Sequence, residues 1–256
     1  MKMKKEDEKI AAVTAYDYSM AKIFDSAGID LMLVGDSMGM VIFGEENTLN
    51  VSISDIIRHT RAVVKGNQNS VVVADMPFLS FQVSLEKAVE NAGEIIQKTG
   101  CSAVKIEGGY FELTKRLVNI GIPVVAHLGF TPQSVKKFGR NIVRGKSNNE
   151  RDYIIESAHK LQKAGASILV LEAVPENLAE KISKELIIPV IGIGSGRKCD
   201  GEIQVCYDIL GLYPDFKPKH AKVFSDSGRS IKEGIEKYIK EVKNNEFPGK
   251  DNVLKK

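Results

Sequence analysis

Cysteine is scarce in this chain, and its spacing gives no signature of a disulfide framework. The 256 residues contain three cysteines, Cys101, Cys199 and Cys206, with no CxxC pair among them. Because no such pair exists and one thiol is left over, we expect buried, reduced cysteines. That state suits the reducing cytoplasm.

Long apolar runs and an excess of one charge are also missing. The first ten residues, MKMKKEDEKI, lack the apolar core of a secretory signal, and no stretch approaches membrane-spanning length. The net charge is only +3, with 36 basic and 33 acidic side chains. The basic residues are spread along the chain with few aromatic residues among them, so neither a nucleic acid nor a membrane is an expected partner. We expect a cytoplasmic protein that acts on small molecules.

Short apolar runs rich in β-branched residues recur along the chain. They are KIAAVTA, IDLMLVG, SVVVAD, CSAVKIE, IPVVAHL, ASILVLE, IPVIGIG and, more weakly, EIQVCYDILG. These runs are continuous rather than alternating, which is typical of strands buried on both faces of a parallel sheet.

Helical segments lie between the runs. Residues 84–100 and 131–139 each start at a capping residue and end on glycine, and residues 150–165 repeat an apolar face. Eight strands alternating with helices predict an α/β fold, a (β/α)8 TIM barrel, as a single domain over residues 1–256. A doubly wound open sheet is the rival. The polar segment 139–150 is expected to be a mobile loop near a site, and the C-terminus an amphipathic helix with a lysine-rich tail.

Polar side chains stand at the ends of six successive predicted strands. They are Tyr16 and Asp17, Asp36 and Ser37, Asp75, Lys105 and Glu107, His127, and Glu172. Because barrel strands direct their C-terminal ends to one face, these residues are expected to converge there. Taken singly, Asp17 is equally well a helix cap and His127 a core histidine. Several charges gathered at one mouth require a cation or a substrate to neutralise them.

Three of these residues, Asp36, Asp75 and Glu107, are hard oxygen ligands with no cysteine partner, the kind that Mg²⁺ prefers. An open magnesium can chelate the carboxylate and ketone of a 2-oxo acid and acidify the adjacent C–H. Lys105 would then hold the substrate carboxylate or the enolate oxygen, and Glu172 would accept the proton.

Other interpretations stay open from the residues alone. The same apparatus suits a lyase or mutase acting on a magnesium-bound 2-oxo acid. Lys105 could instead be a Schiff-base nucleophile of a metal-free aldolase. A barrel kept for assembly or ligand binding would require the carboxylates to be vestigial. The glycine-rich stretch GIGSGRKCDG, residues 192–201, could cradle a phosphate or simply make a tight turn.

The ordered motifs resemble the ketopantoate hydroxymethyltransferase family over nearly the whole chain. They are TAYD (14–17), GDSMGM (35–40), HT (59–60), ADMPF (74–78), VKIEGG (104–109), HLGFTPQSV (127–135), LEAVP (171–175), PVIGIGSG (189–196) and DG (200–201). The resemblance implies a magnesium-dependent barrel that transfers a one-carbon unit from 5,10-methylenetetrahydrofolate to 3-methyl-2-oxobutanoate. The product is 2-dehydropantoate, on the route to pantothenate and coenzyme A. The resemblance also implies a homo-oligomer, commonly a decamer.

By match of motif, the resemblance implies roles for six residues of this chain. Asp36, Asp75 and Glu107 are similar to the metal-binding carboxylates, and Asp36 and Asp75 also lie next to the substrate. Ser37 and Lys105 resemble the substrate-binding serine and lysine, and Glu172 the proton acceptor. The chain departs from the family pattern at five positions outside this set, namely Met38, Asn50, Ala126, Ser195 and Glu202. Glu202 replaces the usual glutamine and adds a negative charge near the eighth predicted strand.

Overall fold

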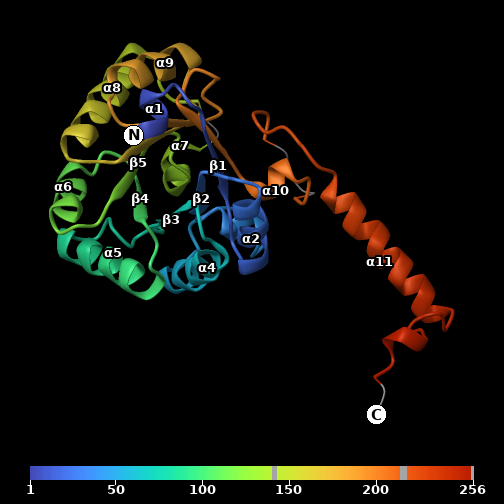
Figure 1. Cartoon of the computed structure of the whole chain (residues 1–256). Coiled ribbons are helices and arrows are strands. Elements are labelled where there is room, and N and C mark those ends of the chain that lie inside the picture. The colour runs from blue at the N-terminus through green and yellow to red at the C-terminus, as the bar shows by residue number, and fades with distance from the viewer. Residues whose placement is uncertain (140–142, 214–217, 255–256) are drawn as a thin grey trace. The chain divides into compact units, whose positions relative to one another are not determined.

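Eight parallel strands close into a barrel in the computed structural model, which describes residues 1–139, 143–213 and 218–254 (Figure 1). The strands are β1 (Ile10–Thr14), β2 (Leu31–Val34), β3 (Val71–Asp75), β4 (Ala103–Glu107), β5 (Val124–Gly129), β6 (Ile168–Glu172), β7 (Val190–Ile193) and β8 (Gly201–Gln204). Each strand pairs with its sequence neighbours, and β8 closes the ring by pairing with β1. The predicted (β/α)8 barrel is therefore confirmed, and the open sheet is excluded.

The chain divides into two compact units, residues 1–205 and 206–256. The first unit carries α1 (Lys2–Lys5), α2 (Tyr18–Ser26), α3 (Met38–Val41), α4 (Ile53–Gly66), α5 (Leu85–Thr99), α6 (Phe111–Asn119), the 3₁₀ turn η1 (Pro132–Ser134), α7 (Val135–Phe138), α8 (Asn148–Lys163) and α9 (Glu176–Glu185). The second carries α10 (Cys206–Ile209), α11 (Ser227–Lys243) and η2 (Lys250–Asn252). The prediction that residues 1–256 form a single domain stays a prediction.

Side-chain caps fix where the longer helices begin. Ser84 accepts a hydrogen bond from the Lys87 amide at the start of α5, and Gly100 ends that helix in the left-handed region at φ 72°. Ser147 caps α8, so this helix begins two residues earlier than predicted. The segment predicted as one helix over 131–139 is instead a 3₁₀ turn followed by the single turn α7.

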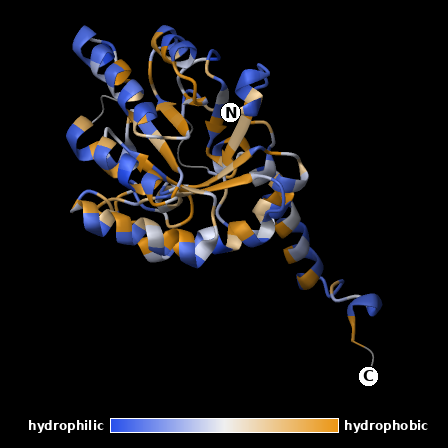
Figure 2. Ribbon diagram, turned by 60° about the vertical axis from the view of Figure 1, so that its left-hand side comes forward, coloured by the Kyte–Doolittle hydropathy of each residue, from blue (hydrophilic) through white to orange (hydrophobic). Residues whose placement is uncertain are grey.

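An aliphatic layer from all eight strands fills the barrel. Its buried members are Ile10, Ala12, Leu31, Leu33, Val73, Ala103, Val125, Val170, Ile191 and Ile203. A second apolar layer lies between the strands and the helices α8 and α9, and it includes Leu161, Leu169 and Leu178. Figure 2 shows the resulting pattern of hydrophobic strands inside helices whose outward sides are hydrophilic. The barrel is thus a packed core, on which polar groups can stand only at the ends.

The remaining features agree with the sequence in part. All three cysteines are buried and free, as predicted. The predicted C-terminal amphipathic helix is α11, in which no residue is buried. The predicted mobile loop 139–150 includes residues 140–142, which lie outside the described residues. In the described part of the chain, no helix has both the length and the apolar character that crossing a membrane requires.

Candidate active site

In each of the four neighbouring strands β3 to β6, a polar residue follows, two positions later, an apolar residue that faces the inside of the barrel. The pairs are Val73 and Asp75, Ala103 and Lys105, Val125 and His127, and Val170 and Glu172. Since side chains alternate along a strand, both members of each pair face the inside of the barrel. The strand register sets Asp75 beside Lys105 and Glu107 beside His127. Together with Asp36 at the end of β2, these residues form what we call the polar belt: Asp36, Asp75, Lys105, Glu107, His127 and Glu172.

Lys105 is a buried cation held by carboxylates. Its Nζ donates to Asp75 Oδ1 at 2.7 Å and Oδ2 at 2.9 Å, and lies 3.6 Å from Glu107 Oε1. Burial works to lower the pKa of Lys105, but the neighbouring carboxylates, Asp75 first, raise it above its usual value. The ammonium is therefore charged at any physiological pH.

Asp36 contributes a carboxylate that Lys105 does not neutralise. Its backbone N–H donates to Asp75 Oδ2 at 3.3 Å, and its own Oδ2 accepts from Gln133 Nε2 at 2.9 Å. Burial, followed by the negative charges of Asp75 and Glu107, raises the pKa of Asp36 well above its usual value. This part of the polar belt therefore holds more negative charge than its one lysine offsets.

His127 stands between two glutamates, so it is part of the polar belt rather than an isolated core histidine. Its Nδ1 lies 3.5 Å from Glu107 Oε1, and its Nε2 lies 3.3 Å from Glu172 Oε2. Burial works to lower the pKa of His127, but the two glutamates raise it to about 9. Neither ring nitrogen, nor Glu107 Oε1, has a hydrogen bond of good geometry to any described residue. These buried polar atoms are therefore held by ion-pair contacts rather than by well-formed hydrogen bonds.

The chemistry of this donor set fits a magnesium ion. Asp36 and Asp75 supply hard oxygens from neighbouring strand ends, and Asp36 forms no ion pair with a described residue. Glu107 Oε1 is a further buried oxygen that has ion-pair contacts but no hydrogen bond of good geometry among the described residues. Within residues 1–139, 143–213 and 218–254, however, no three His, Cys, Asp or Glu side chains stand close enough together to enclose an ion. The carboxylates therefore fit the ion by the chemistry of their oxygens and not as a preformed cage.

Glu172 ends β6, whereas Asp36 follows β2, so these two residues lie at opposite ends of the polar belt. Its side chain is 18% exposed, more than that of Lys105 or His127. Ser195 fixes the backbone on both sides of Glu172. The Ser195 hydroxyl donates to the Leu171 carbonyl at 2.8 Å and accepts from the Val174 amide at 3.1 Å. Glu172 is thus partly solvated, and its backbone is held by contacts on both sides.

The end of β1 supports the site without joining the polar belt. Asp17 caps α2, where its side chain accepts from the Met20 amide at 2.9 Å. Of its two proposed interpretations, the structure therefore favours the cap. The Tyr16 hydroxyl lies 2.8 Å from Ser37 Oγ, and His59 Nδ1 lies 2.6 Å from the Tyr16 carbonyl. Ser37 follows Asp36 directly and is partly buried.

Sequence reasoning missed Gln133, which ties three strand ends together. Its side chain donates to Asp36 Oδ2 and to the Met76 carbonyl, both at 2.9 Å, and its backbone amide donates to Glu107 Oε2 at 3.0 Å. The one available signal was its position just after Pro132 in the loop that follows β5. Nothing in that motif indicates which carboxylates the amide would reach.

The glycine-rich turn after β7 is explained by close packing. A Cβ on Gly196 would stand 2.4 Å from the Glu176 side chain, and the Arg197 amide already donates to Glu176 Oε1 at 3.1 Å. These contacts favour the tight-turn interpretation over the phosphate cradle.

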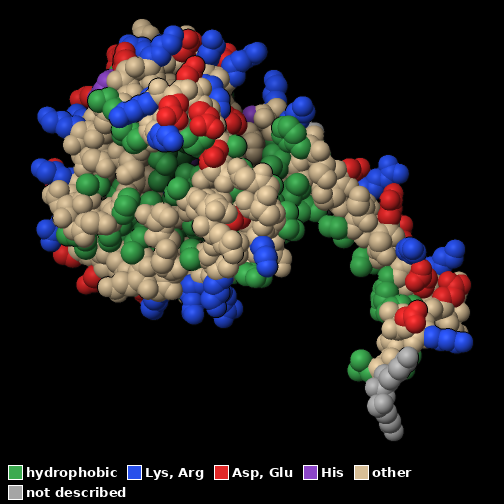
Figure 3. Space-filling view, in the orientation of Figure 1, with side chains coloured by type: hydrophobic (Ala, Val, Ile, Leu, Met, Phe, Trp, Pro, Cys, Tyr) green, Lys and Arg blue, Asp and Glu red, His purple; other side chains and the backbone are tan. Residues whose placement is uncertain are grey.

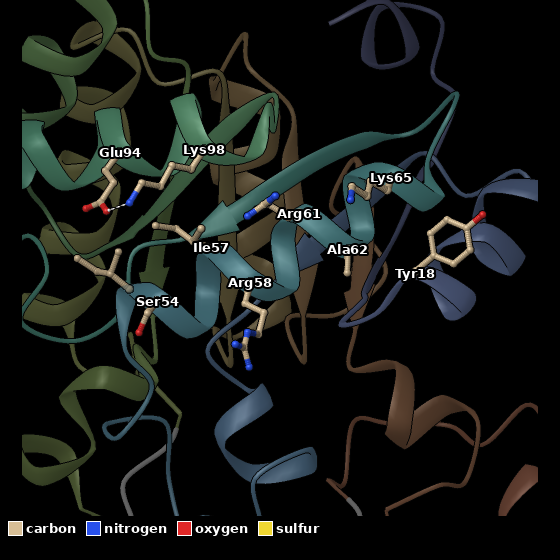
Figure 4. Close-up of a pocket in the computed structure, with 10 residues that line it drawn as sticks. Tyr18, Ser54, Ile57, Arg58, Arg61, Ala62, Lys65, Glu94 and Lys98 are labelled. Atoms are coloured by element: carbon tan, nitrogen blue, oxygen red, sulfur yellow. Dashed lines mark hydrogen bonds and ion pairs between the residues drawn. The ribbon is translucent and has the colours of Figure 1, made fainter.

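Two cavities of similar size flank the barrel. One, of about 690 Å³, is lined by Glu107 and Gln133 and therefore adjoins the polar belt. The other, of about 660 Å³, lies on the outer surface of α4 and is lined by basic side chains, including Arg58, Arg61 and Lys65 (Figure 4). No member of the polar belt lines the outer cavity.

A family model described as ketopantoate hydroxymethyltransferase matches residues 1–250. The chain belongs to the ketopantoate hydroxymethyltransferase family. The family and the enzyme class predicted from the motifs are thereby confirmed.

Curated relatives agree in name and length. A 3-methyl-2-oxobutanoate hydroxymethyltransferase of Clostridium botulinum (strain 657 / Type Ba4) is 51% identical over 255 residues, covering 99% of this chain and 93% of that protein. The protein of the same name from Caldicellulosiruptor bescii is 49% identical over 250 residues, covering 97% of this chain and 94% of the relative.

Solved structures support the fold at much lower identity. Phosphonopyruvate hydrolase, in complex with oxalate and Mg²⁺, has a TM-score of 0.63 at 11% identity and covers 98% of this chain and 88% of its own. A 2,3-dimethylmalate lyase, described as a member of the PEP mutase/isocitrate lyase superfamily, has a TM-score of 0.61 at 15% identity and covers 98% of this chain and 89% of its own. These likenesses confirm the barrel architecture.

Proposed function

We propose that the enzyme transfers a hydroxymethyl group from 5,10-methylenetetrahydrofolate to 3-methyl-2-oxobutanoate, giving 2-dehydropantoate. The observation that carries the proposal is the polar belt, in which a carboxylate pair, a buried ammonium and a separate glutamate line one end of the barrel. Relatives whose sequences are about 50% identical to this chain are named for this reaction. The product belongs to pantothenate and coenzyme A biosynthesis.

Glu172 accepts the proton from C3 of the keto acid. Among the carboxylates of the polar belt that form ion pairs, Glu172 has the most exposed side chain. His127 Nε2 lies 3.3 Å from its Oε2. The protonated imidazole orients the Glu172 carboxylate, because its Nε2 lies beside Oε2. Lys105 faces the developing enolate oxygen or the substrate carboxylate as a fixed positive charge. Ser37 binds the substrate beside Asp36.

Asp36 and Asp75 are the residues that would hold Mg²⁺, with Glu107 as a third carboxylate. When bound, the ion supplies Lewis-acid polarisation of the keto acid oxygens. Magnesium would also supply the counterion that Asp36 lacks.

The net reaction forms one carbon–carbon bond. The C3–H electron pair becomes the new bond between C3 and the folate methylene carbon, while the bonds from that carbon to the folate nitrogens break. One water supplies the oxygen of the new hydroxyl group, and tetrahydrofolate leaves with its nitrogens reprotonated. Glu172 is the residue that carries the C3 proton away.

The test of this assignment is the exchange of the C3 proton for deuterium in 3-methyl-2-oxobutanoate without folate, followed by NMR. Glu172→Gln keeps the size of the side chain but cannot accept a proton, so exchange is expected to fall by about 10²-fold or more. Magnesium binding, measured by calorimetry, is expected to stay near the wild-type value. Unchanged exchange in this variant would remove Glu172 from its role.

Two enzymatic alternatives are distinguishable. A lyase or mutase would form its product without methylenetetrahydrofolate. A Schiff-base enzyme needs a lysine whose pKa is lowered so that the amine is neutral, whereas carboxylates raise the pKa of Lys105. Borohydride trapping of substrate on Lys105 in the presence of EDTA would nevertheless favour the Schiff-base mechanism. Product analysis with and without folate and chelator decides among the three.

We also propose that the enzyme is a homo-oligomer, with a decamer as the expected size. Exposed apolar side chains along α11 support association, because such a face is usually covered by a partner. Figure 3 shows hydrophobic side chains along one side of this helix. They include Ile231, Ile235, Tyr238, Ile239 and Val242. Light scattering after gel filtration measures the assembly directly. A cytoplasmic location stays a prediction.

A further inference from the structure

The cavity of about 690 Å³ beside the polar belt is large enough for a substrate of drug size. Its walls come from the loops after β3, β4 and β5 and from the first turns of α8. Of its lining residues, Glu107 belongs to the polar belt and Gln133 donates hydrogen bonds to Asp36 and Glu107. A molecule in this cavity would therefore reach the reacting keto acid directly.

Large aromatic side chains line this cavity and are unusually accessible. Phe78 is 36%, Tyr110 37% and Tyr153 57% exposed. The Tyr110 ring is fixed by an edge-to-face contact with Phe81 at 5.1 Å between centroids. A Cβ on Gly109 would stand 3.2 Å from the Tyr153 hydroxyl, so the glycine lets Tyr153 lie close to the loop after β4. Exposed rings around one hollow are suited to stacking against a planar ligand.

The two ends of the cavity differ in polarity and burial. At one end, Gln133 and Glu107 are each 5% exposed, and Glu107 Oε1 has no hydrogen bond of good geometry among the described residues, whereas the Gln133 amide is already bonded to Asp36, Met76 and Gln82. At the other, Lys137 is exposed on α7, and its Nζ contacts only the Phe138 ring, 5.8 Å from the centroid, among the described residues. Arg144 is a less available cation because it pairs with Glu150. The cavity thus runs from buried hydrogen-bonding groups, past aromatic rings, to an unpaired cation.

We propose that this cavity binds the folate co-substrate, with the pterin ring at the Gln133 end and the glutamyl carboxylates at Lys137. The inference rests on the proposed function, which supplies the folate. The pterin ring is planar and rich in donors and acceptors, and the tail ends in carboxylates, so the ligand's polarity follows that of the cavity. This orientation also brings the one-carbon unit, which is attached at the pterin end, toward the polar belt.

Calorimetric binding of tetrahydrofolate, under anaerobic conditions, tests the proposal in four variants. Tyr153→Ala removes a stacking surface and is expected to raise the Kd about tenfold. Lys137→Gln removes the cation and is expected to raise the Kd about threefold and to weaken its salt dependence. Tyr18→Ala, which removes an exposed tyrosine from the outer cavity, and Lys136→Gln, one residue from Lys137, are the matched controls and should bind like the wild type.

A second probe separates the two ends of the cavity. Tetrahydropterin has no glutamyl tail, so Tyr153→Ala should weaken its binding while Lys137→Gln should not. Thermal unfolding of each variant checks that the fold is retained. Equal affinities for tetrahydrofolate across all four variants would overturn the proposal, as would a loss in the controls as large as that in Tyr153→Ala.

Deuterium exchange in the wild-type enzyme, taken together with the variant affinities, distinguishes the failure of this proposal from the failure of the proposed function. Deuterium exchange at C3 of the keto acid needs no folate, so it reports on the polar belt alone. If exchange is normal but neither Tyr153→Ala nor Lys137→Gln changes the affinity for tetrahydrofolate, the cavity is not the folate site and the proposed function is unaffected. Absent exchange with affinities that respond as expected would support the cavity and count against the function.

Discussion

Lys105 and Lys98 each hold one carboxylate at nearly the same distance, but in opposite surroundings. Lys105 Nζ lies 2.7 Å from Asp75, with the two side chains 5% and 2% exposed. Lys98 Nζ lies 2.6 Å from Glu94 at the edge of the outer cavity, with the side chains 58% and 41% exposed (Figure 4). The first pair joins two strands at the barrel mouth, and the second joins successive turns of α5.

The comparison shows that contact distance alone does not set the importance of a charge. An exposed pair is screened by water and typically contributes about 0–1 kcal/mol. In a buried pair, removing one partner leaves an uncompensated charge and typically costs about 3–5 kcal/mol. Lys105 also faces Glu107 and Asp36, whose charges have few other partners, whereas Arg61 and Lys65 of the outer cavity lie near solvent.

The largest expected effect follows from removing the buried ammonium. Lys105→Met keeps the aliphatic stem but leaves Asp75 without its ion-pair partner and removes a positive charge near Glu107 and Asp36. With EDTA present, we expect the free energy of unfolding to fall by about 3–5 kcal/mol in urea denaturation. Added Mg²⁺ should restore part of the loss, because it replaces the missing positive charge. A loss below 1 kcal/mol would show that the polar belt is better solvated than its burial indicates.

A smaller effect is expected from pH, through His127. Its pKa is raised to about 9 by Glu107 and Glu172 against the effect of burial, so its ion pairs stabilise the fold fully below about pH 6.5. That contribution is lost as the pH rises through about 9. The wild type should lose about 2 kcal/mol between about pH 7.5 and 9.5 that His127→Gln does not lose, measured by urea denaturation with EDTA.

The comparison with His127→Gln cancels the contributions of other buried acids, including Cys199, whose pKa is raised to about 12 by burial, because both proteins contain them. Burial raises the pKa of Glu202 to about 7 and that of Asp208 to about 6, so both have titrated largely before the pH window begins. Parallel pH profiles for the wild type and His127→Gln would mean that the imidazole is not charged in the native state.

The smallest effect belongs to the outer pair. Lys98→Met removes the same kind of contact as Lys105→Met, yet we expect a change within about 0.5 kcal/mol in the same denaturation experiment. High salt should abolish even this difference, because exposed charges are screened. A loss equal to that of Lys105→Met would contradict the distinction between buried and exposed pairs.

Much of the site could be predicted because the barrel has a simple rule. Asp75, Lys105, Glu107, His127 and Glu172 each end a continuous apolar run, and parallel strands in a barrel bring those ends to one face. Gln133 could not be found in this way, because it lies in an irregular loop whose path depends on packing. The chain's short helices were equally hard to predict, since η1 and α7 replace one expected helix.

By themselves, the residues determined the strand candidates, the family and the acidic and basic groups at the strand ends, and they favoured a barrel over an open sheet, whereas closure of the barrel was decided by the tertiary structure. These follow from local patterns, because burial on both faces demands apolar runs and charge is tolerated only where a run ends. Only the tertiary structure decided which charges meet, that Lys105 pairs with Asp75, that His127 lies between two glutamates, and that a cavity adjoins Gln133. Those contacts join residues distant in the sequence, and their energies depend on burial, which no local pattern specifies.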